Sequence, residues 1–195
     1  SYIVHFTFKE ALEEIKAAQQ KGQSVYGETC SHYLIFDESY LDLPNDEGAK
    51  FVLSPALRPK FHQEYLWQAI NNGWLNSISS DHCGFDFKVQ KHLGIGEGKN
   101  FSNIPNGAPG AQGRFTAMWT FGVETGKISK QKFVEVISTN PAKNNGLINK
   151  GHISVGYDAD IVVFDPKYRG KFTLNDFLEG VDYTIYEGLE QKGRV

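Results

Sequence analysis

Two residues able to bind a metal or move a proton lie at predicted strand ends, far apart in the sequence. Asp81 follows a run of alternating apolar residues, 75–80, and His5 lies in the apolar run 2–6. In α/β proteins the carboxyl ends of parallel strands meet at one edge of the sheet, where chemistry is usually placed. We therefore treat His5 and Asp81 as candidates for one site.

The chemistry of these two side chains suits zinc or a similar divalent ion. His5 offers an imidazole nitrogen and Asp81 a carboxylate oxygen, although catalytic zinc normally takes three protein ligands. Asp81 would also be a general base toward a water that a metal acidifies. The alternative remains open that Asp81 and His82 only bond nearby backbone, and that His5 is a satisfied core residue.

Nucleophilic mechanisms have weaker support. Ser80 lacks the Gly-x-Ser-x-Gly turn that exposes a catalytic serine. Cys30 and Cys83 have imidazoles nearby in His32 and His82, but adjacency in sequence does not aim a base at a thiol. Two cysteines this far apart make no disulfide framework, so we expect free thiols and a cytoplasmic protein.

The elements that would position these residues alternate between strand and helix. The patterns predict strands near 2–6, 24–29, 49–53 and 75–80, and helices near 11–21, 63–72, 114–125 and 129–138. The first strand has the continuous apolar pattern of a strand buried on both faces. Short links predict right-handed parallel crossovers. The segment 84–113 has no clear period, and such a long loop is usually functional or disordered.

The character of the sequence changes after Gly146. Two β-like runs joined by a glycine turn occupy 151–166, and the tail to Val195 is loosely β-like. We therefore place a boundary there, with an α/β unit in 1–146 and a β-rich piece in 147–195.

Composition limits the classes of partner. The chain of 195 residues is 40% hydrophobic, enough for a real core, and its net charge of −3 comes without a basic block. We therefore expect no nucleic-acid partner. No apolar run approaches the roughly 20 residues that span a bilayer, so we expect no membrane partner either. His62, His92 and His152 lie in polar surroundings and are expected at the surface.

Seven short motifs occur in one order along the chain. They are Tyr2–His5, Val25–Cys30, Ser54–Arg58, Ser80–Cys83, Ile104–Gly107, Ser138–Lys143 and Gly156–Asp160. The series resembles the D-hydantoinase and dihydropyrimidinase family of cyclic amidohydrolases, essentially from end to end. Ser31–Tyr33 departs from the commoner Pro-Gln-Tyr, and Ala56 and Gly84 replace prolines.

The resemblance implies a fold and a set of roles. Residues 1–146 would be the later part of a metal-dependent (β/α)8 TIM barrel, and 147–195 part of a small β-sandwich. Two divalent metal ions, zinc by resemblance, would bind, with His5 a ligand of one and Asp81 of the other. Asp81 would also pass a proton to the leaving ring nitrogen, and Ser54 and Asn106 would hold the cyclic amide largely through backbone groups.

The implied reaction is ring opening of a dihydropyrimidine or 5-substituted hydantoin to an N-carbamoyl amino acid. The remaining metal ligands fall outside this sequence, so we expect the isolated chain to be inactive; the family also suggests a homotetramer. One rival is a non-catalytic, dihydropyrimidinase-like scaffold protein, similar to the collapsin response mediator proteins. Another is an allantoinase or dihydroorotase. The presence of His5 and Asp81 favours an enzyme, and the motif Ile104–Gly107 favours the hydantoinase branch.

Overall fold

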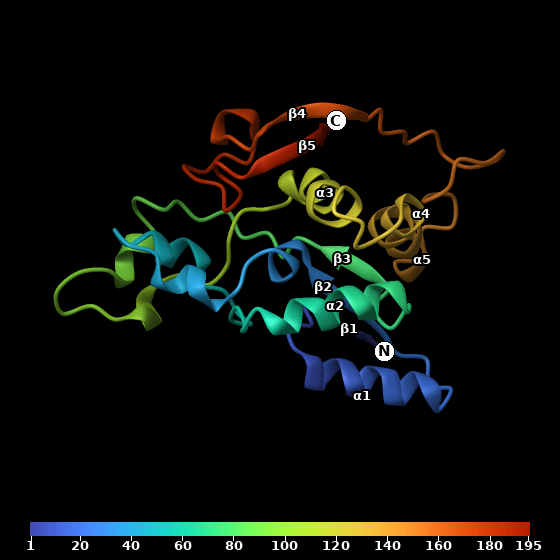
Figure 1. Cartoon of the computed structure of the whole chain (residues 1–195), viewed down its shortest axis with the longest axis horizontal. Helices are drawn as coiled ribbons and strands as arrows, with labels where there is room; N and C mark the ends of the chain where they lie inside the picture. The colour runs from blue at the N-terminus through green and yellow to red at the C-terminus, as the bar shows by residue number, and fades with distance from the viewer.

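A three-stranded parallel sheet occupies the middle of the structure, a computed structural model that describes residues 1–195. Its strands are β1 (Tyr2–Ile3), β2 (Tyr26–Cys30) and β3 (Ser77–Ser79), paired in the order β1-β2-β3 (Figure 1). The predicted parallel pairing of these strands is confirmed. Because each strand ends in the same direction, the residues that follow β1, β2 and β3 share one edge of the sheet.

The first strand is more exposed than its sequence suggests. Tyr2, Ile3 and Val4 are 40%, 45% and 47% exposed, so the prediction of a strand buried on both faces is wrong in this structure. The reason is position, since β1 is at the margin of the sheet and pairs only with β2.

Two amphipathic helices connect the strands. They are α1 (Lys9–Gln20) and α2 (Phe61–Asn71), which pack against each other, with α1 lowest and α2 between α1 and β3 in the view of Figure 1. Leu12 and Ile15 of α1 are buried, as are Leu66 and Ile70 of α2. These apolar positions recur at helical spacing, which is why the sequence predicts both helices.

A histidine from α2 caps the amino end of α1. The Lys9 N–H donates to Nδ1 of His62 over 3.1 Å, and the ring of His62 meets that of Phe8 edge-on. The expectation that His62 lies at the surface is therefore wrong, because the ring satisfies one of the free N–H groups at the helix start. His152 is exposed as predicted, and His92 is partly buried.

The remaining helices are α3 (Gly113–Met118), α4 (Lys130–Val134) and α5 (Asn140–Asn144). Single wide π-turns, Trp119–Val123 and Glu135–Thr139, continue α3 and join α4 to α5. The helices predicted near 114–125 and 129–138 are confirmed, with the Ser129 hydroxyl accepting from the Lys132 N–H at the start of α4. None of the helices of the structure has the length and apolar character needed to cross a membrane.

The strand predicted at 49–53 is wrong. A short 3-10 helix, η3 (Glu47–Phe51), stands there, and its backbone packs so closely on Leu41 that only a glycine fits at position 48. Phe51 and Leu53 are buried all the same. An apolar run this short meets the burial requirement in either conformation, so its pattern cannot decide between them.

The carboxyl-terminal part is built on an antiparallel pair, β4 (Asp165–Lys171) and β5 (Glu190–Arg194), with β5 in contact with α3. No strand forms in 151–164, where Ile153 is 88% and Val163 83% exposed. The β-like pattern of that stretch finds no neighbouring strand edge with which to pair. The domain boundary at 146 stays a prediction.

Candidate active site

The two residues predicted as metal ligands have an unusual backbone conformation. His5 has a φ of 43° and Asp81 a φ of 44°, in the left-handed region, and only Asn45 and Asp46 share this among the non-glycine residues. Such a conformation costs about 1–3 kcal/mol and persists where the surrounding structure enforces it, often at functional sites. Each strained residue lies two positions after the end of a strand of the parallel sheet.

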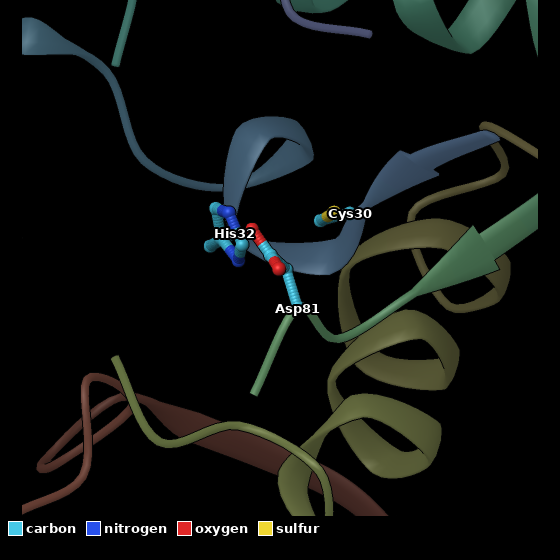
Figure 2. A group of neighbouring side chains, drawn as sticks. All are labelled: Cys30, His32 and Asp81. Atoms are coloured by element: carbon cyan, nitrogen blue, oxygen red, sulfur yellow. The ribbon is translucent and has the colours of Figure 1, made fainter. Parts of the chain in front are cut away.

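Asp81 belongs to a cluster of three possible ligands. One ligand atom each from Cys30, His32 and Asp81 lies within 4.8 Å of the others. Cys30 ends β2, His32 lies in the 3-10 turn η1 (Ser31–Leu34) that follows it, and Asp81 comes just after β3. Figure 2 shows the Asp81 carboxylate next to the His32 ring, with the Cys30 thiol at the end of its strand.

His32 links this cluster to His5. The His32 side chain is 3% exposed, and its Nε2 atom is buried without a hydrogen-bond partner. Burial first, and the nearby imidazole of His5 second, lower the pKa of His32 to about 3. The ring is therefore neutral near pH 7 and keeps a nitrogen lone pair for a ligand.

His32 is the site residue that sequence reasoning missed as a ligand candidate. Its sequence context suggests only a possible base for Cys30. The signal was available, because His32 follows a strand end just as Asp81 does. Imidazole, thiol and carboxylate together fit a divalent ion of the zinc type, and the unpartnered Nε2 atom is consistent with such an occupant.

A chain of hydrogen bonds crosses the strands close to this cluster. Cys30 Sγ lies 3.2 Å from Ser79 Oγ, which donates to one Glu28 oxygen over 2.7 Å, and the Tyr2 hydroxyl donates to the other over 2.7 Å. Burial raises the pKa of Cys30 to about 12, so this thiol is protonated unless a bound cation displaces the proton. Both cysteines are free, as predicted, and a thiolate mechanism gains no support.

His82 turns away from the cluster. Its Nδ1 atom accepts from the Gly110 N–H over 3.2 Å and lies 3.7 Å from Glu179. For His82, the structural role left open by the sequence is the one observed.

Ser54 and Asn106, the predicted substrate-binding residues, are exposed on two loops that touch each other. The Gly107 N–H donates to the Val52 carbonyl over 3.0 Å, which joins the loops next to Asn106 and two residues before Ser54. No hydrogen bond links Ser54 or Asn106 directly to Asp81 or His5. The backbone therefore brings these loops together, while their side chains remain free.

Further bonds fix these two loops at the edge of the sheet that carries the cluster. The Tyr33 hydroxyl, one residue beyond His32, donates to the Pro55 carbonyl over 2.7 Å. The Cys83 N–H, two residues beyond Asp81, donates to the Ala108 carbonyl over 3.0 Å. Beside the loops opens a mainly apolar cavity of about 420 Å³ that includes Asn106 in its lining. The loops are thus tied to the segments carrying the cluster.

Comparison with known proteins identifies the family of this chain. The sequence model of the amidohydrolase family matches residues 3–195. The chain therefore belongs to the amidohydrolase family, whose members have a TIM-barrel fold and depend on metal ions.

Within this family, the chain is similar to hydantoinases and dihydropyrimidinases. D-hydantoinase of Geobacillus stearothermophilus is 47% identical over 193 residues, which cover 98% of this chain and 40% of that protein. Dihydropyrimidinase from Brevibacillus agri NCHU1002 superposes with a TM-score of 0.95 at 45% identity, over 100% of this chain and 42% of that one. The L-hydantoinase of Arthrobacter aurescens reaches a TM-score of 0.86 at 28% identity, over 98% of this chain and 41% of that one.

The resemblance read from the sequence motifs is thus confirmed. The chain spans about 40% of the length of the curated relatives that it matches.

Proposed function

We propose that this chain is the carboxyl-terminal part of a metal-dependent hydrolase that opens cyclic amides. One observation supports the proposal: His32 and Asp81 lie together with Cys30 near the ends of β2 and β3, and His5, close to the end of β1, shares the positive φ of Asp81. The likeness to D-hydantoinases and dihydropyrimidinases supports the reaction class.

In this proposal His5 and Asp81 each hold one of two divalent ions, with zinc as the metal. The other ligands belong to the part of the relatives that this chain does not match. A bound ion would supply positive charge that polarises the amide carbonyl and makes water more acidic. The isolated chain would have an incomplete ligand set and no activity.

Asp81 is the residue proposed to move the proton. Its exposed carboxylate takes a proton from the attacking water and delivers it to the ring nitrogen as the C–N bond breaks. His32, neutral and buried beside it, adds no competing positive charge.

The proposed substrates are a dihydropyrimidine or a 5-substituted hydantoin, because the relatives bear the names of enzymes for both. Backbone groups beside Ser54 and Asn106 hold the planar amide of the ring. Water adds to the carbonyl carbon, the ring C–N bond breaks, and the product is an N-carbamoyl amino acid. By resemblance the complete protein would be a homotetramer.

The test uses a polypeptide that contains the complete barrel together with this chain. Asp81→Asn removes the base and a ligand charge, so we expect hydrolysis of dihydrouracil and hydantoin to fall by about 10²–10⁴-fold or more. Steady-state kinetics and elemental analysis measure turnover and metal content. Asp42→Asn, at an exposed carboxylate of η2 (Glu38–Asp42), is the matched control and should behave as wild type.

Two results would contradict the proposal. Wild-type protein without bound metal and without turnover would leave a scaffold protein as the better explanation. Full activity in Asp81→Asn would remove Asp81 from the mechanism.

A further inference from the structure

Lys91 is a completely buried lysine in the long segment 84–112, coloured green in Figure 1. It begins the 3-10 turn η4 (Lys91–Gly94), and its side chain has 0% exposure. Burying an ammonium group is costly unless strong acceptors replace the lost water. Its acceptors therefore show what the residue holds in place.

Those acceptors are backbone carbonyls from two separate loops. Lys91 Nζ donates to the Val52 carbonyl over 3.1 Å and to the Pro105 carbonyl over 2.6 Å. Val52 lies two residues before Ser54, and Pro105 immediately precedes Asn106. One cation thus bonds to the backbone beside each of the two predicted substrate-binding residues.

The Val52 carbonyl is a shared point in this arrangement. It accepts from the Gly107 N–H as well as from Lys91 Nζ, so both of its lone pairs are used. The ring of Phe85 lies 5.9 Å from Nζ and adds a weak cation–π contact. None of the ion pairs of the structure includes Lys91, and the acceptors of its ammonium group are the two loop carbonyls.

We propose that Lys91 is a positioning residue that holds the Ser54 and Asn106 loops at a fixed spacing, so that backbone groups of both grip one cyclic amide. This inference rests on the proposed function. Tyr33 and Cys83 tie the same loops to the segments that carry His32 and Asp81. Lys91 adds a tie between the loops, and their separation would otherwise depend on the single Gly107–Val52 bond.

The test compares Lys91→Met with Lys99→Met in a polypeptide containing the complete barrel. Lys91→Met keeps the length of the side chain but removes the donors. Lys99 also donates to one backbone carbonyl, that of His92, but is exposed on the same segment, so it controls for loss of a lysine. For Lys91→Met we expect KM for dihydrouracil to rise about 10-fold to 100-fold, kcat to change less, and bound metal to stay constant.

Hydrogen exchange supplies a measurement independent of turnover. Amides of 52–56 and 104–108 should exchange faster in Lys91→Met, and as in wild type in Lys99→Met. Unchanged exchange in both loops would show that Lys91 does not hold the two loops together. Faster exchange with an unchanged KM would overturn its role toward substrate.

Folding failure and failure of the proposed function give different results. If Lys91→Met does not fold, Lys91→Arg keeps the cation but alters its geometry, and the same KM and exchange changes are expected from it. Wild-type protein that does not hydrolyse the substrate would overturn the proposed function, and with it the substrate role of Lys91. Exchange would still decide whether Lys91 joins the loops.

Discussion

At the scale of single residues, two buried ionisable side chains stand out near the candidate site. His32 is held neutral beside a carboxylate, and Lys91 is an ammonium surrounded by protein. Neither arrangement would be expected of a residue chosen for stability alone, because an apolar side chain of similar size would avoid the desolvation.

Lys91 gives a pH-dependent stability that can be measured. Burial lowers the pKa of Lys91 from 10.5 to about 8, while the neighbouring Cys83 raises it slightly. Between pH 8 and 10.5 the unfolded chain therefore binds more protons at this residue than the folded one. The contribution of Lys91 to the free energy of unfolding should increase with pH in this window and stay constant below pH 8.

Urea unfolding of wild type, Lys91→Met and Lys99→Met between pH 7 and pH 10 measures this difference. Above pH 8, the free energy of unfolding of wild type should increase relative to that of Lys91→Met. Lys99→Met should show the same pH dependence as wild type. Parallel curves for wild type and Lys91→Met would contradict the lowered pKa.

At the scale of elements, the turn after Asn106 depends on a glycine. Gly107 has a φ of 122°, and a Cβ there would lie 2.6 Å from the Cys83 sulfur. The backbone approaches the segment after Asp81 too closely for any side chain. The Asn106 loop can therefore bond to both neighbours only if position 107 is glycine.

Gly107→Ala tests this turn against Gly96→Ala. Gly96 also has a positive φ, 108°, but a Cβ there meets nothing within 4 Å. Both variants should lose about 1–3 kcal/mol from backbone strain. Gly107→Ala should lose a further 1–3 kcal/mol, approximately, from overpacking. Denaturant unfolding measures both, and equal losses would show that the contact with Cys83 is unimportant.

The elements also show what a sequence can predict. The helices 9–20 and 61–71 have long periodic apolar faces, and the strands that follow Ser1 and precede Asp81 alternate with them at regular spacing. Their positions were therefore predictable. The turn at 47–51 was not, because Phe51 is equally buried in a helix or a strand. His62 was misjudged because a cap depends on a partner 53 residues away.

Candidate site residues can be predicted where they lie just after the strands of a parallel sheet, since those positions share one edge of the sheet. That rule predicts His5 and Asp81 as ligands, which stays a prediction, and both residues have a positive φ. His32 obeys the same rule but was weighed only as a partner for Cys30. The sequence does not indicate a role for Lys91, because its acceptors are backbone carbonyls, which every residue type possesses.

At the scale of the whole molecule, unpaired edges are the main feature. The outer edge of β1 lacks a neighbouring strand and is exposed, whereas at β3 the Arg114 side chain donates to the Ile78 carbonyl; the stretch 151–164 also carries exposed apolar side chains. Such edges template pairing with other chains.

The isolated chain should therefore self-associate. Sedimentation velocity at increasing concentration should show growing species. The double variant Ile153→Lys and Val163→Lys should reduce them, because charge on an exposed apolar stretch opposes pairing. Leu178→Lys, at a residue 92% exposed elsewhere on the surface, is the matched control and should have little effect. A monodisperse monomer at all concentrations would show that these edges are harmless.

The order of the parallel sheet has a consequence for synthesis. Each strand pairs with the next one along the chain, Tyr2 with Tyr26 and Glu28 with Ser77. Within this sheet, a strand leaving the ribosome thus finds its partner already made, so none of the sheet's pairings has to wait for the carboxyl terminus. This part of the protein can grow outward from β1 one strand at a time during translation, while β4 waits for β5.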